Sequence, residues 1–431
     1  MLARLRAAVR IFIDASEQTD GCDRPIVFGM SLVERLLRGA REVGIAPEEV
    51  CIALAPGAAE PALPGDIAGF APLRFERDVR NGPDALCEYA ASGSAVVAIC
   101  ADAIVDARLF AQLSEDAGNR VFESAEDAQE DERGVVLWLQ PGVRCAGGSL
   151  EEAARALLAS GAATRLSADE FSGYITMLRR DLPPYLFRIR DDAARKRVER
   201  FLFWSNYKGS TDFMTRYVYP PFVWVMVGPL ARLRVHPNWV TGVDIIATFA
   251  AVPYFMAGEW VPGLLLAFLM SVLDSVDGKL ARVTFTSSKL GEILDHGLDI
   301  VHPPIWYMAW GVALSGGAAG SLPWEASLWM LGLYIADRLS TMVFKWRHKV
   351  SIHGFTAFDE RVRTFISRRN VNLPFFTVAL AIDALRGDAD WTASTYCFYA
   401  IVIWQAVCVA FHIERVIQFW GQGGKRAGSS A

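Results

Sequence analysis

Hydrophobic residues are distributed unevenly along the chain, which has a polar first part and an apolar second part. Before about residue 170, short β-branched runs occur at residues 10–15, 50–55, 95–102 and 135–141, with amphipathic helical patterns between them. Strands that alternate with helices predict an α/β layer with a mostly parallel sheet. We therefore predict a soluble α/β domain over residues 1–170.

A charged segment follows this predicted domain. Residues 170–216 have a helical pattern that includes RIRDDAARKRVER at 188–200, and residues 217–233 are apolar but contain three prolines. The charge run fits a solvated helix face, and contact with lipid headgroups is the alternative. We assign residues 171–234 to a linker with juxtamembrane or interfacial helices.

The remainder of the chain is apolar enough to enter a membrane. A span needs about 20 predominantly apolar residues, with a range of about 17–25. Six candidate stretches lie at about residues 239–257, 260–281, 288–315, 323–345, 371–386 and 392–418. We predict a membrane domain of six transmembrane helices over residues 235–420, followed by a tail at 421–431.

Basic residues indicate the orientation of these helices. They are concentrated after the second and fourth stretches and in the tail, at Arg282, Lys289, Lys345, Arg347, Lys349, Arg361, Arg363, Arg368, Arg369, Lys425 and Arg426. The opposite loops, around 258–260 and 316–322, carry none, although Arg386 borders the loop at 387–391. The positive-inside rule then places both termini on the cytoplasmic side. We expect a multi-pass protein of the inner (cytoplasmic) membrane.

Composition is consistent with a membrane protein that carries a soluble part. The chain is 52% hydrophobic with 13 tryptophans, and its net charge of -5 gives no reason to expect nucleic-acid binding. Its seven cysteines show no C-x-x-C pair, so we interpret them as reduced thiols. The first apolar run ends at Asp14 and is too short for a secretory signal.

Four aspartates interrupt the second and third apolar stretches: Asp274, Asp277, Asp295 and Asp299. A carboxylate at membrane depth is costly unless it faces a protein interior or a watery cavity, so such residues mark function. At 100° per residue, each pair lies about one turn apart on one helix face. Converging carboxylates are stabilised by divalent cations that prefer oxygen ligands. We predict a cage for one or two metal ions.

The spacing D-x2-D-G-x2-A-R-x8-G-x3-D-x3-D, over residues 274–299, resembles the signature of the CDP-alcohol phosphotransferase family, and all eight fixed positions are filled. The resemblance implies that the four aspartates bind two Mg²⁺ or Mn²⁺ ions and that Asp299 is a candidate base. HPNWVT at 236–241 is similar to the P-N-x-x-T element of the family's first span. The resemblance implies nucleotide or phosphate contacts from Gly278, Ala281, Arg282, Gly291, Asn238 and Thr241.

Two further resemblances concern the acceptor. G-E-I-L-D-H-G-L-D, at 291–299, is similar to a segment of choline and ethanolamine phosphotransferases, which implies a role in proton transfer for Glu292 and His296. Alternatively, His296 only forms a hydrogen bond at the cavity edge. KGSTDFMTRYVYPP, at 208–221, resembles a region of fused inositol-phosphate transferases. The basic residues that could hold an acceptor phosphate or headgroup are Lys208, Arg338, Arg361, Arg363 and Arg368. Alternatively, the positive-inside rule alone explains this cluster.

The soluble part resembles a sugar-phosphate nucleotidyltransferase domain at residues 31–45 and 98–110. In such enzymes an aspartate at the position of Asp102 binds the catalytic metal. A working domain also needs a glycine-rich basic loop for the triphosphate, but IDASEQTDGCDRP carries Asp14, Glu17 and Asp20 there. We expect a degenerate domain that regulates, binds a partner or supports assembly.

Together these observations predict a CDP-alcohol phosphotransferase of phospholipid or polar-lipid synthesis that releases CMP and forms a homodimer, as the family resemblance implies. The donor could be CDP-diacylglycerol or a CDP-linked polar alcohol, and the acceptor is open. One alternative is a bifunctional enzyme that also makes its CDP-alcohol in the N-terminal domain. Another is a non-catalytic membrane scaffold that retains the acidic cage.

Overall fold

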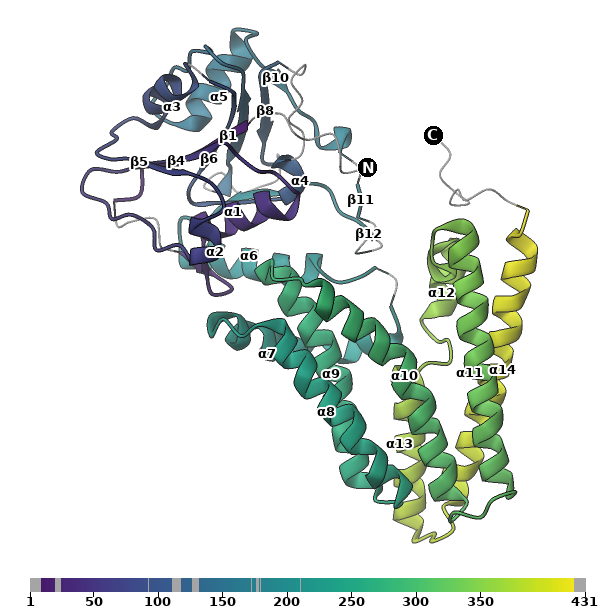
Figure 1. The fold of residues 1–431 in the computed structure, drawn as a ribbon. Helices are drawn as coiled ribbons and strands as arrows, with labels where there is room; N and C mark the ends of the chain where they lie inside the picture. The colour runs from purple at the N-terminus through teal and green to yellow at the C-terminus, as the bar shows by residue number, and fades with distance from the viewer. Residues whose placement is uncertain are drawn as a thin grey trace.

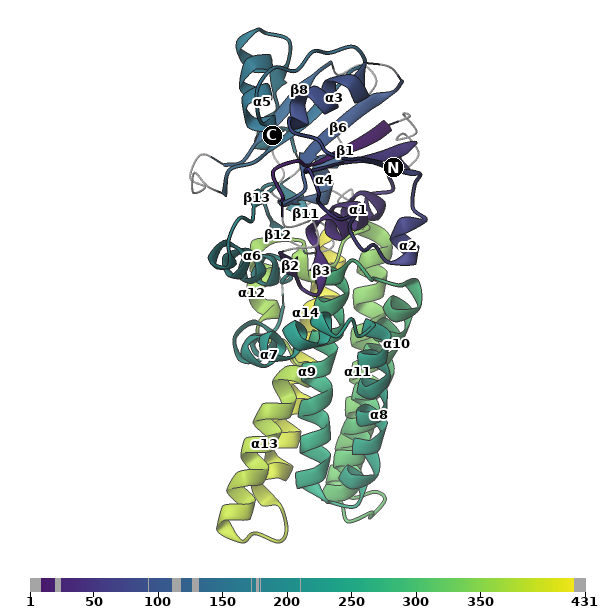
Figure 2. The ribbon, with the colours of Figure 1, turned by 90° about the vertical axis from the view of Figure 1, so that its left-hand side faces the viewer.

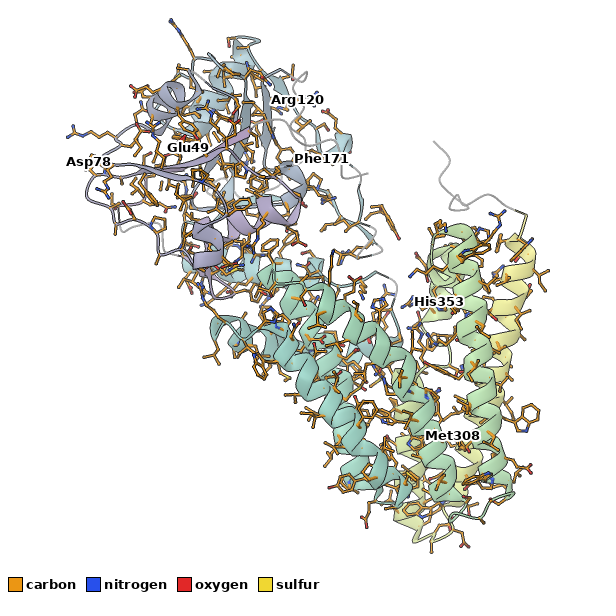
Figure 3. The ribbon with its side chains drawn as sticks, in the orientation of Figure 1. Glu49, Asp78, Arg120, Phe171, Met308 and His353 are labelled. Atoms are coloured by element: carbon orange, nitrogen blue, oxygen red, sulfur yellow. The ribbon has the colours of Figure 1, made fainter. Side chains whose placement is uncertain are left out.

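The structure, a computed structural model, has an N-terminal part built on a β-sheet and a C-terminal part built from long helices (Figure 1). It describes residues 9–19, 25–91, 93–110, 118–125, 132–171, 173–175, 178, 180–209 and 211–421. Asp20, Cys22, Lys425 and Arg426 lie outside these ranges. In Figure 3, Glu49, Asp78, Arg120 and Phe171 mark the N-terminal part, and Met308 and His353 mark the helical part.

The N-terminal part contains a seven-stranded sheet in the order β10-β8-β9-β6-β1-β4-β5. Four neighbouring pairs are parallel, and the two pairs that involve β9 are antiparallel. The strands are β1 (Val9–Ala15), β4 (Glu49–Leu54), β5 (Leu73–Glu76), β6 (Ala95–Cys100), β8 (Arg120–Glu123), β9 (Val135–Leu139) and β10 (Thr164–Arg165). The predicted α/β layer with a mostly parallel sheet is therefore present.

Helices cover both faces of this sheet. The helix α1 lies on one face and α3 and α5 lie on the other (Figure 2). The right-handed crossovers β1–α1–β4 and β5–α3–β6 run in opposite directions across the sheet, which places α1 and α3 on opposite faces. Buried aliphatic side chains of these helices share one core with the strands. The N-terminal helices are α1 (Leu32–Glu42), α2 (Gly65–Ala68), α3 (Gly82–Ala90), α4 (Ala107–Phe110) and α5 (Leu150–Ala159).

Short hairpins and strand pairs extend the N-terminal part towards the helices. The strand β13 (Leu186–Arg188) pairs with β7 (Ala103–Val105), so a stretch within the predicted linker joins the N-terminal part. The remaining pairs are β2 (Ile26–Val27) with β3 (Met30–Ser31) and β11 (Tyr174–Ile175) with β12 (Arg180–Asp181). The charged run then forms α6 (Asp192–Ser205), which Asp191 caps by accepting a hydrogen bond from the Ala194 backbone N–H.

Long helices form the second part. The predicted interfacial segment forms α7 (Pro220–Arg232), and a short helix α12 (Ala357–Arg363) follows the fourth long helix. The six long helices are α8 (Pro237–Met256), α9 (Trp260–Thr284), α10 (Lys289–Leu314), α11 (Leu322–His348), α13 (Arg369–Arg386) and α14 (Thr392–Phe419). The end of α14 lies at the end of the helical part that also carries the N-terminal sheet (Figure 1).

Three of these helices are long and apolar enough to cross a membrane: α8, α9 and α14. Large apolar side chains remain exposed on them, including Trp239, Ile246, Leu265 and Ile403. Such exposure is unfavourable in water and is expected where a helix contacts lipid. The helical part is therefore membrane-embedded.

The two parts of the chain meet at a very close backbone contact. Gly29, in the turn between β2 and β3, has φ +75°, and a Cβ at this position would lie 2.1 Å from the backbone oxygen of Ala231 at the end of α7. Neither the backbone angle nor the space suits a larger residue. Glycine is therefore required here for the N-terminal part to approach α7.

We expect Gly29→Ala to destabilise the protein by about 1–3 kcal/mol, because the added methyl group forces the two backbones apart. Gly57 is the matched control, since its φ is +74° but nothing lies within 4 Å of a Cβ there. Gly57→Ala adds only backbone strain, so the free energy of unfolding should fall less in this variant than in Gly29→Ala. Thermal unfolding of the full chain in detergent measures both, and equal losses would contradict the clash.

Candidate functional site

Three of the four predicted acids lie together where α9 approaches α10. Asp274 of α9 and Asp295 and Asp299 of α10 each offer a carboxylate oxygen, and these oxygens lie within 4.8 Å of one another. Both α9 and α10 pack against α8, so the acids meet across a space beside α8. Ser288 caps α10 by accepting a hydrogen bond from the Gly291 backbone N–H, which fixes where α10 begins after α9 has ended.

The fourth acid, Asp277, has a different environment. It is buried and accepts a hydrogen bond of 2.7 Å from the Thr241 hydroxyl on α8, and its other oxygen lies 2.5 Å from the Gly278 backbone nitrogen. Asp277 is therefore not in the three-acid group. Through this hydrogen bond Thr241, which is predicted to contact a nucleotide, connects α8 to α9.

The small residues of the motif allow close approaches. A Cβ on Gly278 would lie 3.2 Å from Nη1 of Arg282, so glycine leaves room for the guanidinium. A Cβ on Gly291 would lie 2.9 Å from Oδ1 of Asn238, which also accepts a hydrogen bond from the Ser288 hydroxyl. Gly278 and Arg282 line the cavity described next, whereas Ala281, Gly291 and Asn238 are not among its lining residues.

The acids line a cavity of about 210 Å³ that is also lined by basic residues. Four of them, which we call the basic wall, come from α11, the end of α12, the segment after α12 and the segment after α6. These residues are Lys208, Arg338, Arg363 and Arg368. These are four of the five residues predicted to hold an acceptor, and the fifth, Arg361, is exposed and does not line the cavity.

Two of the cavity's guanidinium groups have buried atoms without hydrogen-bond partners. The Nε atoms of Arg282 and Arg338 are buried and have no partner among the described residues. A buried donor that is left unsatisfied costs about 1–3 kcal/mol, and more when it is charged. These atoms are therefore suited to an anionic ligand such as a phosphate group.

The three candidates for proton transfer are placed differently. Asp299 lines the cavity, and its side chain is 56% exposed. His296 is 66% exposed, with Nδ1 3.8 Å from a carboxylate oxygen of Asp295, and Glu292 is also exposed. Neither His296 nor Glu292 is among the cavity-lining residues. Of the three, only Asp299 has access to the cavity in this structure.

Arg369, at the start of α13, was not predicted as a site residue, although it is one of the basic residues that follow the fourth apolar stretch. Its guanidinium lies 3.3 Å from Asp274 and 3.7 Å from Asp299. It also donates a hydrogen bond of 2.7 Å to Nε2 of the fully buried His302, whose Nδ1 lies 2.6 Å from the Leu298 carbonyl oxygen. Arg369 therefore supplies positive charge directly to the acidic group.

A buried acid on α8 was also missed. Asp244 is 2% exposed, and its Oδ1 has no hydrogen-bond partner among the described residues. The available signal was the occurrence of an aspartate inside the apolar run TGVDIIATFAA. An ionisable residue at membrane depth is itself a functional candidate.

The three-acid group suits a divalent cation. Asp274, Asp295 and Asp299 provide oxygen donors, which Mg²⁺ and Mn²⁺ prefer, on two helices and within 4.8 Å of one another. Asp277, the fourth predicted ligand, lies outside this group and accepts a hydrogen bond from Thr241. The donor set therefore fits a metal ion held by three carboxylates.

In the N-terminal part, a cavity lined by Asp102 and Glu17 is present, but Asp102 is already paired with an arginine. Asp102, which resembles a metal-binding aspartate, accepts hydrogen bonds of 2.8 and 2.9 Å from Arg188 of β13. Arg188 is buried and also forms ion pairs with Glu17 and Glu151. Arg188 is thus paired with the carboxylate that a catalytic metal would need as a ligand.

Comparisons with known proteins agree with the position of the site. Residues 234–412 match the family model of the CDP-alcohol phosphatidyltransferases. The chain is 37% identical over 112 residues to choline/ethanolaminephosphotransferase 2 of Arabidopsis thaliana, covering 23% of this chain and 28% of that protein. It is 37% identical over 78 residues to an archaetidylinositol phosphate synthase of Aeropyrum pernix, covering 18% of this chain and 40% of the relative.

A third relative is the bifunctional IPC transferase and DIPP synthase of Thermococcus kodakarensis, with 30% identity over 145 residues. That match covers 30% of this chain and 33% of the relative, so the chain spans well under half of each of these proteins.

Among solved structures, a Bacillus anthracis protein assigned as a glucose-1-phosphate thymidylyltransferase covers 45% of this chain and 94% of its own length. Its identity is 13% and its TM-score is 0.29, so this likeness carries no argument about function.

The match to residues 234–412 contains the whole signature on α9 and α10, the Asn238–Thr241 element and Arg369. It is therefore this region of the chain that is similar to the CDP-alcohol phosphatidyltransferases.

Proposed function

We propose that this chain is an integral membrane CDP-alcohol phosphotransferase, with six transmembrane helices and its site at the cytoplasmic side. The observation that carries the proposal is a single cavity lined both by three clustered carboxylates and by the four side chains of the basic wall. The family match at residues 234–412 supports the reaction class. The end of α14 and the N-terminal sheet lie at the same end of the helical part, and this position supports an even number of spans.

Different residues of the cavity would bind the cations and the phosphate groups. Asp274, Asp295 and Asp299 would hold divalent cations, which neutralise charge on the diphosphate when bound. Arg282 is placed to bind phosphate oxygens, and the absence of a side chain on Gly278 leaves space beside it. The basic wall then holds an anionic group of the acceptor or the donor.

The reaction exchanges one phosphorus–oxygen bond for another. The acceptor hydroxyl oxygen forms a bond to the phosphorus that carries the alcohol. The bond from that phosphorus to the bridging diphosphate oxygen breaks, and CMP leaves with this oxygen. Asp299 would accept the hydroxyl proton, because its carboxylate reaches the cavity and Glu292 and His296 do not.

The donor can be found by assaying the full chain in membranes. One set of reactions contains radiolabelled CDP-diacylglycerol with polar-alcohol and polar-alcohol phosphate acceptors. A second set contains CDP-choline or CDP-ethanolamine with diacylglycerol. We expect CMP release with one of these donors, and a phosphorylated acceptor is favoured by the basic wall. Absence of CMP from every donor, with folded protein and metal present, would support the scaffold alternative.

We expect chelation to remove this activity. EDTA should abolish CMP release, and added Mn²⁺ or Mg²⁺ should restore it, because three carboxylates alone leave the diphosphate charge unneutralised. A restored activity that is saturable in metal measures the affinity of the site. Full activity in EDTA, after dialysis against chelator, would contradict the metal assignment.

A homodimer remains a prediction from the family resemblance, and cross-linking in membranes can test it. The bifunctional alternative is disfavoured by the contact between Asp102 and Arg188. Incubation of the protein with CTP and polyol or sugar phosphates should release no pyrophosphate.

A further inference from the structure

A residue of the N-terminal part contacts the end of the helix that carries the phosphotransferase motif. Arg35 of α1 donates a hydrogen bond of 2.7 Å from Nη1 to the backbone oxygen of Val283, in the last turn of α9. Arg35 is 5% exposed, and these two residues are 248 positions apart in the sequence. The last carbonyl groups of a helix lack partners within the helix, and a cation placed there is stabilised by the helix dipole.

The residue that ends α9 also packs against α1. Phe285 adopts a left-handed conformation with φ 52° and stops the helix. The Arg35 guanidinium lies over its ring, with Cζ 4.9 Å from the centroid. Burial lowers the pKa of Arg35 to about 10, so the side chain stays charged near neutral pH. Arg35 therefore holds both a carbonyl of the last turn and the residue that terminates the helix.

A shared hydrophobic core supports this contact. Val276, Leu280 and Val283 of α9 belong to the same buried cluster as Val27 and Leu32 of the N-terminal part. An ion pair adds to it: Glu34, 1% exposed, lies 2.8 Å from Arg234, just before α8. The two parts thus form one packed unit at this end of α9.

A second connection involves the motif directly. Lys279, which follows Gly278, is 1% exposed and donates a hydrogen bond of 2.8 Å to the backbone oxygen of Phe203 near the end of α6. Its Nζ also lies 3.2 Å from the centroid of the Tyr207 ring. Tyr207 precedes Lys208, a residue of the basic wall, so Lys279 connects α9 to a segment that also lines the cavity.

The consequence for the site follows from sequence position. Val283 directly follows Arg282, and the same helix supplies Asp274 and Gly278 to the cavity. A helix whose last turn frays or shifts would carry Arg282 away from the place where a diphosphate binds. A misplacement of about 1 Å can cost roughly a hundredfold in rate.

We propose that the N-terminal domain is a positioning element for the phosphotransferase site, and that Arg35 is the positioning residue that fixes the last turn of α9 and thereby Arg282. This inference rests on the proposed function, because it is Arg282 as a phosphate-binding residue that gives the position its importance. The N-terminal domain, which was expected to be a degenerate nucleotidyltransferase-like domain, would then have a role that requires no catalytic activity.

The test compares three variants of the full chain in detergent or membranes. Arg35→Gln removes the charge and Arg35→Lys retains it. Arg41→Gln changes a half-buried arginine of the same helix whose side chain pairs only with Asp66 among the described residues. We expect Arg35→Gln to lower kcat for CMP release about tenfold per folded protein and to raise the KM for the CDP-donor. Arg35→Lys should recover part of the loss, and Arg41→Gln should match the wild type.

Hydrogen exchange provides a readout that needs no turnover. The backbone amides in the last turn of α9 should exchange faster in Arg35→Gln than in Arg41→Gln, while the middle of α9 is unchanged. Normal kinetics and unchanged exchange in Arg35→Gln would overturn the inference. An inactive wild type would instead count against the proposed function, and the exchange data would still decide whether Arg35 holds the helix.

Discussion

Asp299→Asn should reduce CMP formation roughly a thousandfold, equivalent to about 4 kcal/mol of transition-state stabilisation. The asparagine keeps the size of the side chain but removes its charge, so it is a poorer metal ligand and cannot serve as the base. The aspartate is 56% exposed, and its ion pair with Arg369 is long at 3.7 Å, so the substitution should leave the fold intact. Turnover in membranes should therefore fall strongly, while the thermal unfolding midpoint should stay close to that of the wild type.

Asp390→Asn is the matched control for this experiment. Asp390 is an exposed aspartate in the loop between α13 and α14, outside the cavity-lining set, so its variant should keep wild-type turnover. Asp274→Asn and Asp295→Asn should both resemble Asp299→Asn, because their oxygens belong to the same group. Unchanged turnover in Asp299→Asn would falsify the catalytic assignment.

The sequence predicts the helices well because a membrane span imposes length and polarity together. The stretch predicted at 260–281 is Trp260–Thr284, and the one predicted at 392–418 is Thr392–Phe419. Among the long helices in the described part of the chain, only α8, α9 and α14 meet the length and hydropathy criteria for a membrane span. The other three contain polar residues that face the cavity, such as Asp295, Asp299 and Arg338, so the functional groups themselves weaken the span signal.

The site was predictable where its geometry is local. Asp295 and Asp299 are one helical turn apart, and this spacing alone places them on one face. The hydrogen bond from Thr241 to Asp277 could not be predicted, because it depends on how α8 packs against α9. Arg369 reaches Asp299 from 70 residues away in the sequence, and helical periodicity carries no information about such a contact.

The contact between the two parts of the chain was also beyond sequence reasoning. In an amphipathic helix the charged residues are expected on the solvent face. In α1, however, Glu34, Arg35 and Arg38 are all buried, because the face opposite the sheet packs against α9 and the segment before α8. Charged residues that are buried by a second part of the same chain look identical, in sequence, to residues on a solvated surface.

Arg369→Met should destabilise the protein by about 3–5 kcal/mol in the absence of divalent metal, since removal of one partner of a buried ion pair leaves the other uncompensated. The side chain of Arg369 is 8% exposed, and it is shared between Asp274, Asp299 and His302. Methionine fills a similar volume but leaves the carboxylates without their nearby positive charge. The unfolding midpoint in detergent with EDTA measures the loss, and Arg386→Met, at the exposed end of the same helix, is the matched control.

Metal should then rescue this variant more than it stabilises the wild type. A cation at a hundred times its Kd contributes about 2.7 kcal/mol to the folded state. In the wild type, an ion at Asp274 and Asp299 must share these carboxylates with Arg369, whereas in Arg369→Met it has them alone. The rise in midpoint on adding Mn²⁺ should therefore be larger in the variant, and Arg369→Lys should lie between the two. Equal rises in all three proteins would show that the ion and the arginine do not use the same carboxylates, and would move the metal site away from this group.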